Sequence, residues 1–263
     1  EDRVTEAQRC HRPTLWRHFT ELLIAKIVDA GKLMKSNVTK AIFPATGLGT
    51  RFLPTTKSIP KEIITLVDRT LIQYALDEAR AVGIKQFIFI TLRGKNALED
   101  YVDRGPQLEL ELRKKGKDDL LETLDHQHEK RRHRLCLPAQ GDGLSHAVWC
   151  ARNLFANEPF AVILHDDFVA ADTPSLQQMV DVHAETSGNM VAAIGVLEAR
   201  TSSYGILDCA GRDGRLVDVK GMVQKPETGI EPSNIAVMGR YVLAPNVLRN
   251  PNRIKRSPTA RCS

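Results

Sequence analysis

The stretch Phe43–Leu66, FPATGLGTRFLPTTKSIPKEIITL, decides how the rest of the chain is interpreted. It continues from a short apolar run, Lys40–Ala45, that predicts a strand, and open α/β sheets bind ligands where such strands end. Gly47 and Gly49 let the backbone approach a ligand closely, and successive N–H groups in such a loop bind anions. Arg51 offers a planar guanidinium to phosphate oxygens. The stretch therefore predicts a phosphate-binding loop.

Two widespread phosphate-binding motifs do not fit this loop. A dinucleotide-binding fingerprint needs Gly or Ala where Phe52 stands, and a P-loop needs Gly-Lys-Ser/Thr after its first glycine. A tight turn is the structural alternative for an isolated Gly-x-Gly. The longer pattern is more specific because it adds Lys57, Lys61 and three prolines that stiffen the loop.

Short apolar runs alternate with helical patterns around the loop. We expect strands over 86–91, 160–164 and 190–196, and helices over 71–81, 96–102, 107–124 with a break near Gly116, 144–154 and 176–186. This alternation predicts an α/β fold with a mainly parallel sheet covered on both faces. Denser strands near 204–207, 216–219 and 236–243 predict an added antiparallel piece for substrate.

The two ends differ from the middle of the chain. Residues 1–35 form an N-terminal extension in which Leu15–Ile27 has a helical pattern. Because Met34 precedes the first clear strand, this segment is interpreted either as an extension or as a helix that packs on the domain. Residues 36–248 are expected to form the main domain, and 249–263 a basic tail without pattern.

Composition excludes several classes of protein. The mixture of 42% hydrophobic and 26% charged residues is typical of a globular chain. A net charge of +5 suits a phosphate-rich partner, but aromatic residues at 5% are too few for a nucleic-acid stacking platform, so no nucleic acid is expected. Five cysteines without Cys-x-x-Cys spacing indicate a reduced, cytoplasmic protein. No apolar run is long enough for a membrane span.

One cluster of histidines looks like a metal-binding segment. His126, His128 and His133 surround a run of Lys and Arg that would repel a cation. We therefore interpret this segment as a solvated face.

The loop resembles the signature G-x-G-T-R-x-L-P-x-T-K-x-x-P-K-E of the bacterial UTP–glucose-1-phosphate uridylyltransferases. The resemblance runs in order from Val38 to Val247. It continues in the segments GLSHAVWCA (143–151), AVILHDD (161–167), YGILDC (204–209), QKP (224–226) and PSNIAVMGRYVL (232–243). It implies a Rossmann-like nucleotidyltransferase. Such an enzyme transfers uridylyl from UTP to glucose 1-phosphate, with Mg²⁺, and gives UDP-glucose and pyrophosphate.

The resemblance also implies roles for individual residues. Those that would contact the nucleotide are Ala45, Thr46, Gly47, Gly49, Glu62, Gln140 and Gly143. Those that would hold phosphates and act in catalysis are Arg51, Lys61 and Lys225. On the sugar side are Gly205, Gln224 and Asn234, and Asp166 matches the magnesium aspartate. These residues also have purely structural interpretations. Asp166 and Asp167 can cap a turn, and Gln140 and Lys225 can be ordinary loop residues.

The chain departs from the family pattern at four places. By the resemblance, the segment from Gln140 to Gly143 is about two residues shorter than the corresponding loop of the family. His165 replaces a proline, and Gln224 replaces a glutamate. After Val247 the resemblance ends, although the family continues with a second magnesium aspartate and much of its dimer contact. We therefore expect weak activity and poor solubility, and a homo-oligomer only if that region were present.

Two rival functions follow from these departures. One is a nucleotidyltransferase for another nucleotide, such as dTTP, or for another sugar 1-phosphate. The other is a protein that binds a sugar nucleotide without turning it over.

Overall fold

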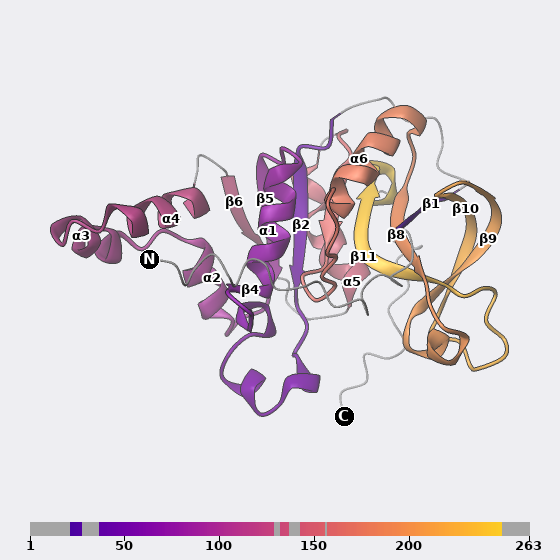
Figure 1. Ribbon diagram of the computed structural model, residues 1–263, viewed down its shortest axis with the longest axis horizontal. Coiled ribbons are helices and arrows are strands. Elements are labelled where there is room, and N and C mark those ends of the chain that lie inside the picture. Colours follow the sequence, from indigo (N-terminus) through magenta and orange to yellow (C-terminus); the bar gives the residue numbers. More distant parts are fainter. Residues whose placement is uncertain (1–21, 28–36, 129–131, 137–142, 156, 249–263) are drawn as a thin grey trace, which may run out of the picture.

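The computed structural model describes residues 22–27, 37–128, 132–136, 143–155 and 157–248. Within these ranges a mixed nine-stranded sheet runs in the order β6-β5-β2-β7-β11-β8-β1-β10-β9 (Figure 1). Its strands are β1 Leu23–Ile27, β2 Lys40–Ala45, β5 Gln86–Thr91, β6 Arg132–Cys136, β7 Phe160–Ile163, β8 Met190–Gly195, β9 Gly205–Asp213, β10 Leu216–Gln224 and β11 Ile235–Leu243.

The sheet has a parallel part and a largely antiparallel part. Strands β6, β5, β2 and β7 pair in parallel, and β11 then pairs antiparallel with both β7 and β8. Beyond β8, β1 runs antiparallel to β8 and parallel to β10, and β9–β10 is an antiparallel hairpin. The expected α/β fold with an added antiparallel piece is confirmed.

Helices cover both faces of the sheet. They are α1 Leu71–Ala81, α2 Asn96–Val102, α3 Pro106–Lys114, α4 Asp118–His128, α5 Leu144–Cys150 and α6 Ser175–Thr186. Helices α1, α2 and α6 pack with Phe43 and Phe87 on one face, whereas α5 packs with Ile42 and Ile88 on the other. This division follows from the strand period of two, which turns neighbouring side chains to opposite faces. None of the described helices is both long and apolar enough to span a bilayer.

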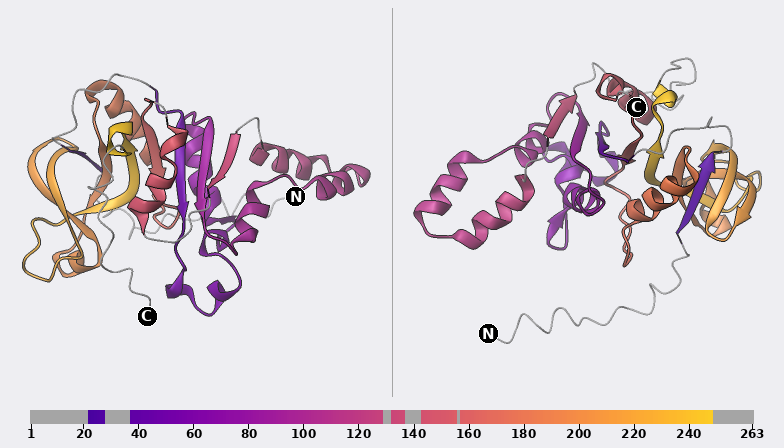
Figure 2. Two further views of the ribbon diagram at one scale, coloured as in Figure 1. Left: turned by 180° about the vertical axis from the view of Figure 1, so that it is seen from behind. Right: turned by 90° about the horizontal axis from the view of Figure 1, so that it is seen from above.

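The predicted break near Gly116 is confirmed. Gly116 has a positive φ of 63° between α3 and α4, a conformation that glycine adopts without strain. The two helices form a hairpin that projects away from the sheet (Figures 1 and 2). Leu108, Leu110 and Leu120 are exposed on this hairpin.

The helix expected over Leu15–Ile27 is wrong where the structure describes it. Residues Leu23–Ile27 form strand β1 in the interior of the sheet, and residues 1–21 lie outside the described part. A short apolar run fits a buried strand or a buried helix equally well, so periodicity alone does not decide between them.

The solvated face expected around His126, His128 and His133 is wrong for His133, which is half-buried, whereas Arg134 and Leu135 of the same strand are exposed. His133 lies in β6 at the edge of the sheet, and its Nδ1 is 3.0 Å from the carbonyl oxygen of Val102. Its ring meets Phe87 and Phe89 edge-on. Charged strands such as RHRLC are typical of sheet edges. The side chains of His126 and His128 lie outside the described part.

Candidate active site

The phosphate-binding loop begins where β2 ends at the buried Ala45. Gly49 has a φ of 69°, and its carbonyl oxygen accepts hydrogen bonds from Thr56 Oγ1 at 2.8 Å and from the N–H of Phe52. A Cβ at Gly49 would lie 3.0 Å from Thr56 Cγ2. The loop then continues through three short 3₁₀ turns: η3 Thr50–Phe52, η4 Thr55–Lys57 and η5 Lys61–Ile63. Position 49 therefore requires glycine, both because its φ is positive and because a Cβ would crowd Thr56.

Lys61 joins the loop to the end of a neighbouring strand. Its side chain lies against Gly47, where an added Cβ would be 3.3 Å from Lys61 Cε. Its Nζ is 2.8 Å from Asp166 Oδ2. Lys61 thus holds Gly47 of the phosphate-binding loop and Asp166, the expected metal ligand, close to each other.

Two aspartates follow β7 and have opposite electrostatic surroundings. Partial burial opposes ionisation of Asp166, whose side chain is 46% exposed, but the hydrogen bond and the charge of Lys61 outweigh it and hold the pKa of Asp166 below its ordinary value. Burial, with the charge of Asp166, raises the pKa of Asp167. Asp166 is therefore the carboxylate held in its charged form, as a cation ligand must be.

The end of β7 is fixed from behind by a buried arginine. Arg240 in β11 is 2% exposed, and its guanidinium lies 2.8 Å from Glu78 Oε2 and donates to the carbonyl oxygen of Leu164 at 2.6 Å. Glu78 Oε1 also accepts from the N–H of Leu176 at 2.8 Å. This network holds the backbone just before the two aspartates.

A buried ion pair lies beneath the loop. Lys95 Nζ is 2.8 Å from Glu62 Oε1 and 2.7 Å from the carbonyl oxygen of Gly47. Glu62 is fully buried, so its carboxylate faces the interior and Lys95 rather than the exposed side of the loop. Lys95 was missed by the sequence analysis. It follows β5, whose end pairs with β2 at Thr91 and Ala45.

His165 completes this buried group as a neutral side chain. Burial lowers the pKa of His165 to about 4; the charges of Glu62 and Asp166 act in the opposite direction without overcoming burial. Its Nε2 lies 3.6 Å from Glu62 Oε1, but a neutral imidazole forms no ion pair there. The departure from the family's proline therefore adds no positive charge beside Asp166 near neutral pH.

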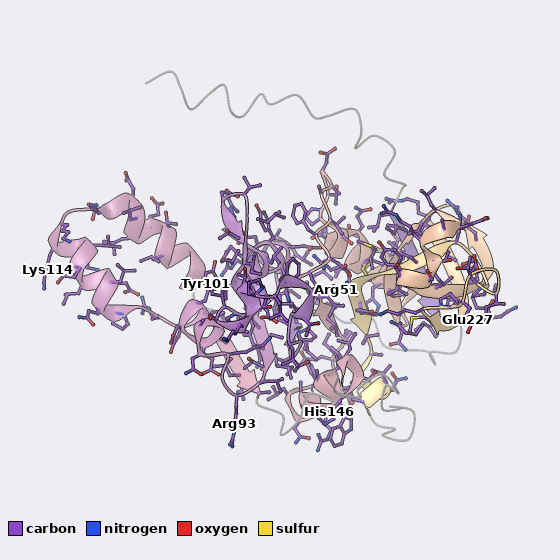
Figure 3. All side chains as sticks on the ribbon, turned by 90° about the horizontal axis from the view of Figure 1, so that it is seen from below. Arg51, Arg93, Tyr101, Lys114, His146 and Glu227 are labelled. Atoms are coloured by element: carbon purple, nitrogen blue, oxygen red, sulfur yellow. The ribbon has the colours of Figure 1, made fainter. Side chains whose placement is uncertain are left out.

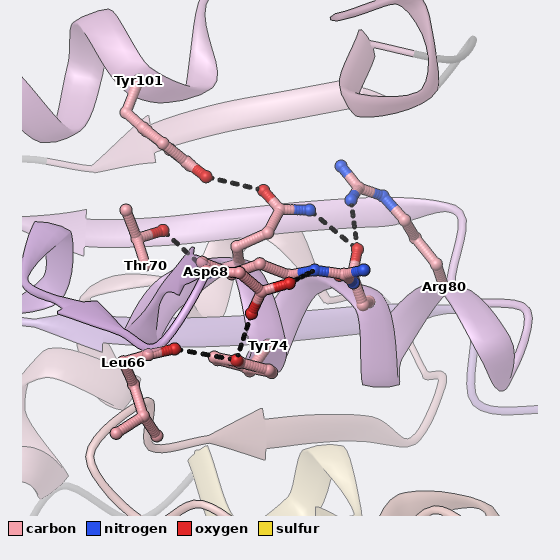
Figure 4. Close-up of polar contacts among 9 residues, drawn as sticks. Leu66, Asp68, Thr70, Tyr74, Arg80 and Tyr101 are labelled. Carbon is pink, nitrogen blue, oxygen red and sulfur yellow. Dashed lines mark hydrogen bonds and ion pairs between the residues drawn. The ribbon is translucent and has the colours of Figure 1, made fainter. Parts of the chain in front are cut away.

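A polar network anchors the far end of the loop (Figure 4). Tyr74 Oη is 2.8 Å from the carbonyl oxygen of Leu66 and 2.9 Å from Asp68 Oδ1, in the turn between the short strands β3 Thr65–Leu66 and β4 Arg69–Thr70. Thr70 caps α1 by accepting from the N–H of Gln73. The loop is therefore fastened to the sheet at one end and to α1 at the other.

Two of the three residues expected on the sugar side, Gly205 and Gln224, lie on the β9–β10 hairpin. Gly205 pairs with Gln224, and a Cβ at Gly205 would lie 3.1 Å from Gln224 Oε1. Lys225 follows directly, with a φ of 48° and its N–H bonded to the carbonyl oxygen of Tyr204. Asn234 precedes β11 and accepts from the N–H of Val196 through its carbonyl oxygen. Gln224, Lys225 and Asn234 are exposed.

The remaining expected site residues are fixed by fewer contacts. Arg51 is exposed on η3 and no hydrogen bond holds its side chain in the described part (Figure 3). Thr46 lies partly buried at the start of the loop. Gly143, with a φ of 94°, precedes α5. Gln140 lies outside the described residues.

The oxygen donors suit magnesium better than a softer metal. Within the described residues no group of three or more His, Cys, Asp or Glu side chains could hold a cation. Magnesium, however, is commonly bound by one or two carboxylates together with substrate phosphates. Asp166, charged and exposed beside the phosphate-binding loop, fits as such a carboxylate.

The sequence matches the nucleotidyl transferase family over residues 40–262. The chain belongs to this family. Among curated relatives, it is 45% identical over 210 residues to the UTP–glucose-1-phosphate uridylyltransferase of Bacillus subtilis, which covers 80% of this chain and 72% of that protein. It is 46% identical over 212 residues to the enzyme of the same name from Komagataeibacter xylinus, covering 80% and 75%.

Solved structures of the family agree with this assignment. A UDP-glucose pyrophosphorylase from Acinetobacter baumannii superposes with a TM-score of 0.77 at 36% identity, covering 83% of this chain and 79% of that one. A UDP-glucose pyrophosphorylase in complex with UDP-glucose gives a TM-score of 0.72 at 38% identity, covering 81% and 78%. The resemblance found in the sequence is confirmed.

Proposed function

We propose that this chain transfers uridylyl from UTP to glucose 1-phosphate and so forms UDP-glucose and pyrophosphate. The observation that carries the proposal is Lys61, which lies against Gly47 of the phosphate-binding loop and is bonded to Asp166. The curated relatives named for this reaction support the choice of substrates.

The chemistry is an in-line displacement at phosphorus. A phosphate oxygen of glucose 1-phosphate forms a bond to the α-phosphorus of UTP, and the bond from that phosphorus to the bridging oxygen breaks as pyrophosphate leaves. No protein nucleophile is required. Catalysis consists of positioning and of neutralising the phosphate charge.

The residues divide this work between two sides. Backbone N–H groups at Gly47 and Gly49, with Arg51 and Lys61, hold the UTP phosphates. Lys225 meets the phosphate of the sugar. The ion pair between Lys95 and Glu62 keeps the loop in place from below. When bound at Asp166, magnesium would offset negative charge on the phosphates.

Several finer points belong to the same proposal. The metal is magnesium. Thr46, Gly143 and Gln140 border the uridine, whereas Gly205, Gln224 and Asn234 border the glucose; Ala45, fully buried at the end of β2, has no exposed surface for a ligand. A homo-oligomer belongs to the proposal only where the family's C-terminal region is present, and the exposed leucines of the α3–α4 hairpin would then offer it apolar surface. Within the described part of the chain Cys136 and Cys209 form no disulfide, which suits the reducing cytoplasm.

Pyrophosphate release tests the proposal. The full chain, magnesium and glucose 1-phosphate are combined with UTP or with dTTP, and Asp166→Asn is compared with Asp100→Asn, an exposed aspartate of α2. We expect release with UTP that Asp166→Asn reduces at least 100-fold and Asp100→Asn leaves unchanged. Faster release with dTTP would contradict the choice of nucleotide. Binding of UDP-glucose without any release would show a non-catalytic relative.

A further inference from the structure

Strand β1 lies outside the part of the chain that matches the family, yet it occupies an interior position of the sheet. The match covers residues 40–262, whereas β1 is Leu23–Ile27. It pairs antiparallel with β8 from Leu23 to Lys26 and parallel with β10 from Ile24 to Ile27. Strands β8 and β10 are therefore joined through β1.

This strand is packed on both of its faces. Ile24 is 1% exposed and belongs to the core beneath α1 and α6, whereas Leu23 and Ala25 belong to the apolar cluster on the opposite face. The N–H of Ile24 donates to the carbonyl oxygen of Arg215, and that of Ile27 to Asn189. Loss of β1 would leave two unpaired strand edges and an open apolar seam.

Among the described strands, the β9–β10 hairpin pairs with the rest of the sheet at two places, and β1 provides the longer of the two pairings. At one end, Leu216–Val219 of β10 pairs with Ile24–Ile27. At the other end, Ile206 of β9 pairs with Ala236 of β11. Figure 2 shows β1, in indigo, lying along the orange hairpin. Without β1 the hairpin would lose the four-residue pairing of β10 with the sheet. It would keep the pairing at Ile206, the hydrogen bond from Ser233 Oγ to the carbonyl oxygen of Leu207 and the bond from Arg215 to Gln178, so β10 would be held less firmly than β9.

That hairpin carries Gly205 and Gln224, and Lys225 follows it. The nucleotide side of the site, by contrast, is carried by β2, β5 and β7. Strand β2 pairs with both β5 and β7, and β7 pairs with β11. We infer that β1 is a positioning strand for the sugar side of the site, supplied from outside the family-matched region. The assignment of these residues to the sugar rests on the proposed function.

The matched variants are Leu23→Ala with Ile24→Ala, which weakens the docking of β1, and Ile27→Ala, whose side chain is 39% exposed at the end of the same strand. Amide hydrogen exchange and the dissociation constants of UTP and UDP-glucose are measured on the full chain. In the double variant we expect exchange to rise at least tenfold in β10 and to stay unchanged in β2 and β5. We expect UDP-glucose binding to weaken about tenfold and UTP binding less than twofold.

Two results would overturn the inference. One is unchanged exchange in β10. The other is an equal loss of UTP and UDP-glucose binding with faster exchange in β2 and β5, which would make β1 a general stabilising strand. If the double variant does not fold, Ile24→Val removes a single methylene and should give the same order of effects at smaller amplitude. Should the unaltered chain bind neither nucleotide, the proposed function fails, while hydrogen exchange still reports whether β1 holds the hairpin.

Discussion

Lys61 Nζ lies 2.8 Å from Asp166 Oδ2, so one ion pair joins the phosphate-binding loop to the end of β7. The side chain of Lys61 also fills the space that a Cβ at Gly47 would need. The loop glycine, the loop cation and the candidate metal ligand are therefore placed with respect to one another by a single residue.

Replacing Lys61 with Met should abolish this arrangement. We expect the rate of pyrophosphate release to fall at least 100-fold, because a cation is lost where phosphate charge must be neutralised. The pKa of Asp166 should rise, since the hydrogen bond and charge that lower it are removed. Steady-state kinetics and a titration of Asp166 by NMR measure the two effects. Lys57→Met, at an exposed lysine of the same loop, is the control and should lose far less activity.

Replacing Lys95 with Met should destabilise the protein and displace the loop. Glu62 is fully buried, and removing its cation leaves a buried charge without compensation, which typically costs about 3–5 kcal/mol. Denaturant unfolding measures this cost, with Lys114→Met as control because its ion pair with Glu111 is exposed. Equal stability of the two variants would show that the Lys95–Glu62 pair has little structural importance.

Gly239→Ala should damage the end of β7 through a steric clash. The added Cβ would lie 2.6 Å from both Leu164 Cβ and Asp167 Oδ2. We expect a loss of about 2 kcal/mol in the free energy of unfolding, together with reduced turnover, because the displaced backbone leads into Asp166. Gly211→Ala is a matched control in β9, since its Cβ would meet nothing within 4 Å. If both glycines tolerate alanine equally, the close packing at Gly239 is not required.

Acid should destabilise the protein in a window set by His165. The pKa of His165 is about 4 in the folded chain and near 6.5 when unfolded, so the unfolded state binds the proton first. Its contribution is complete above about pH 6.5 and is lost as the pH falls toward 4, by about 3 kcal/mol. Unfolding measured across this range should show a shallower loss in His165→Gln. An unaltered slope in His165→Gln would contradict this prediction.

The loop and the strands around it were predictable from sequence because their signals are local. The apolar run of β2 ends at glycines, the Thr70 cap begins α1, and Gly116 separates α3 from α4. The family resemblance put Asp166 at the end of a strand, and the structure has it just after β7 beside the loop, since parallel strands end at the same edge of a sheet.

Strand β1 was not predictable because its neighbours come from distant parts of the chain. Leu23–Ile27 is too short for periodicity to separate a strand from a helix, and only the pairing with β8 and β10 decides. Lys95 was missed for a related reason. Its signal was its position just after β5, the strand beside β2, and that position gains meaning only once the strand order is known.

Detection of UDP-glucose by chromatography tests the proposed uridylyl transfer most directly. The full chain is incubated with UTP, glucose 1-phosphate and magnesium. We expect UDP-glucose and pyrophosphate in equal amounts from the unaltered chain and neither product from Asp166→Asn or Lys61→Met. Absence of UDP-glucose from the unaltered chain, or its undiminished formation by both variants, would contradict the proposal that the Lys61–Asp166 pair forms the centre of a uridylyl transfer site.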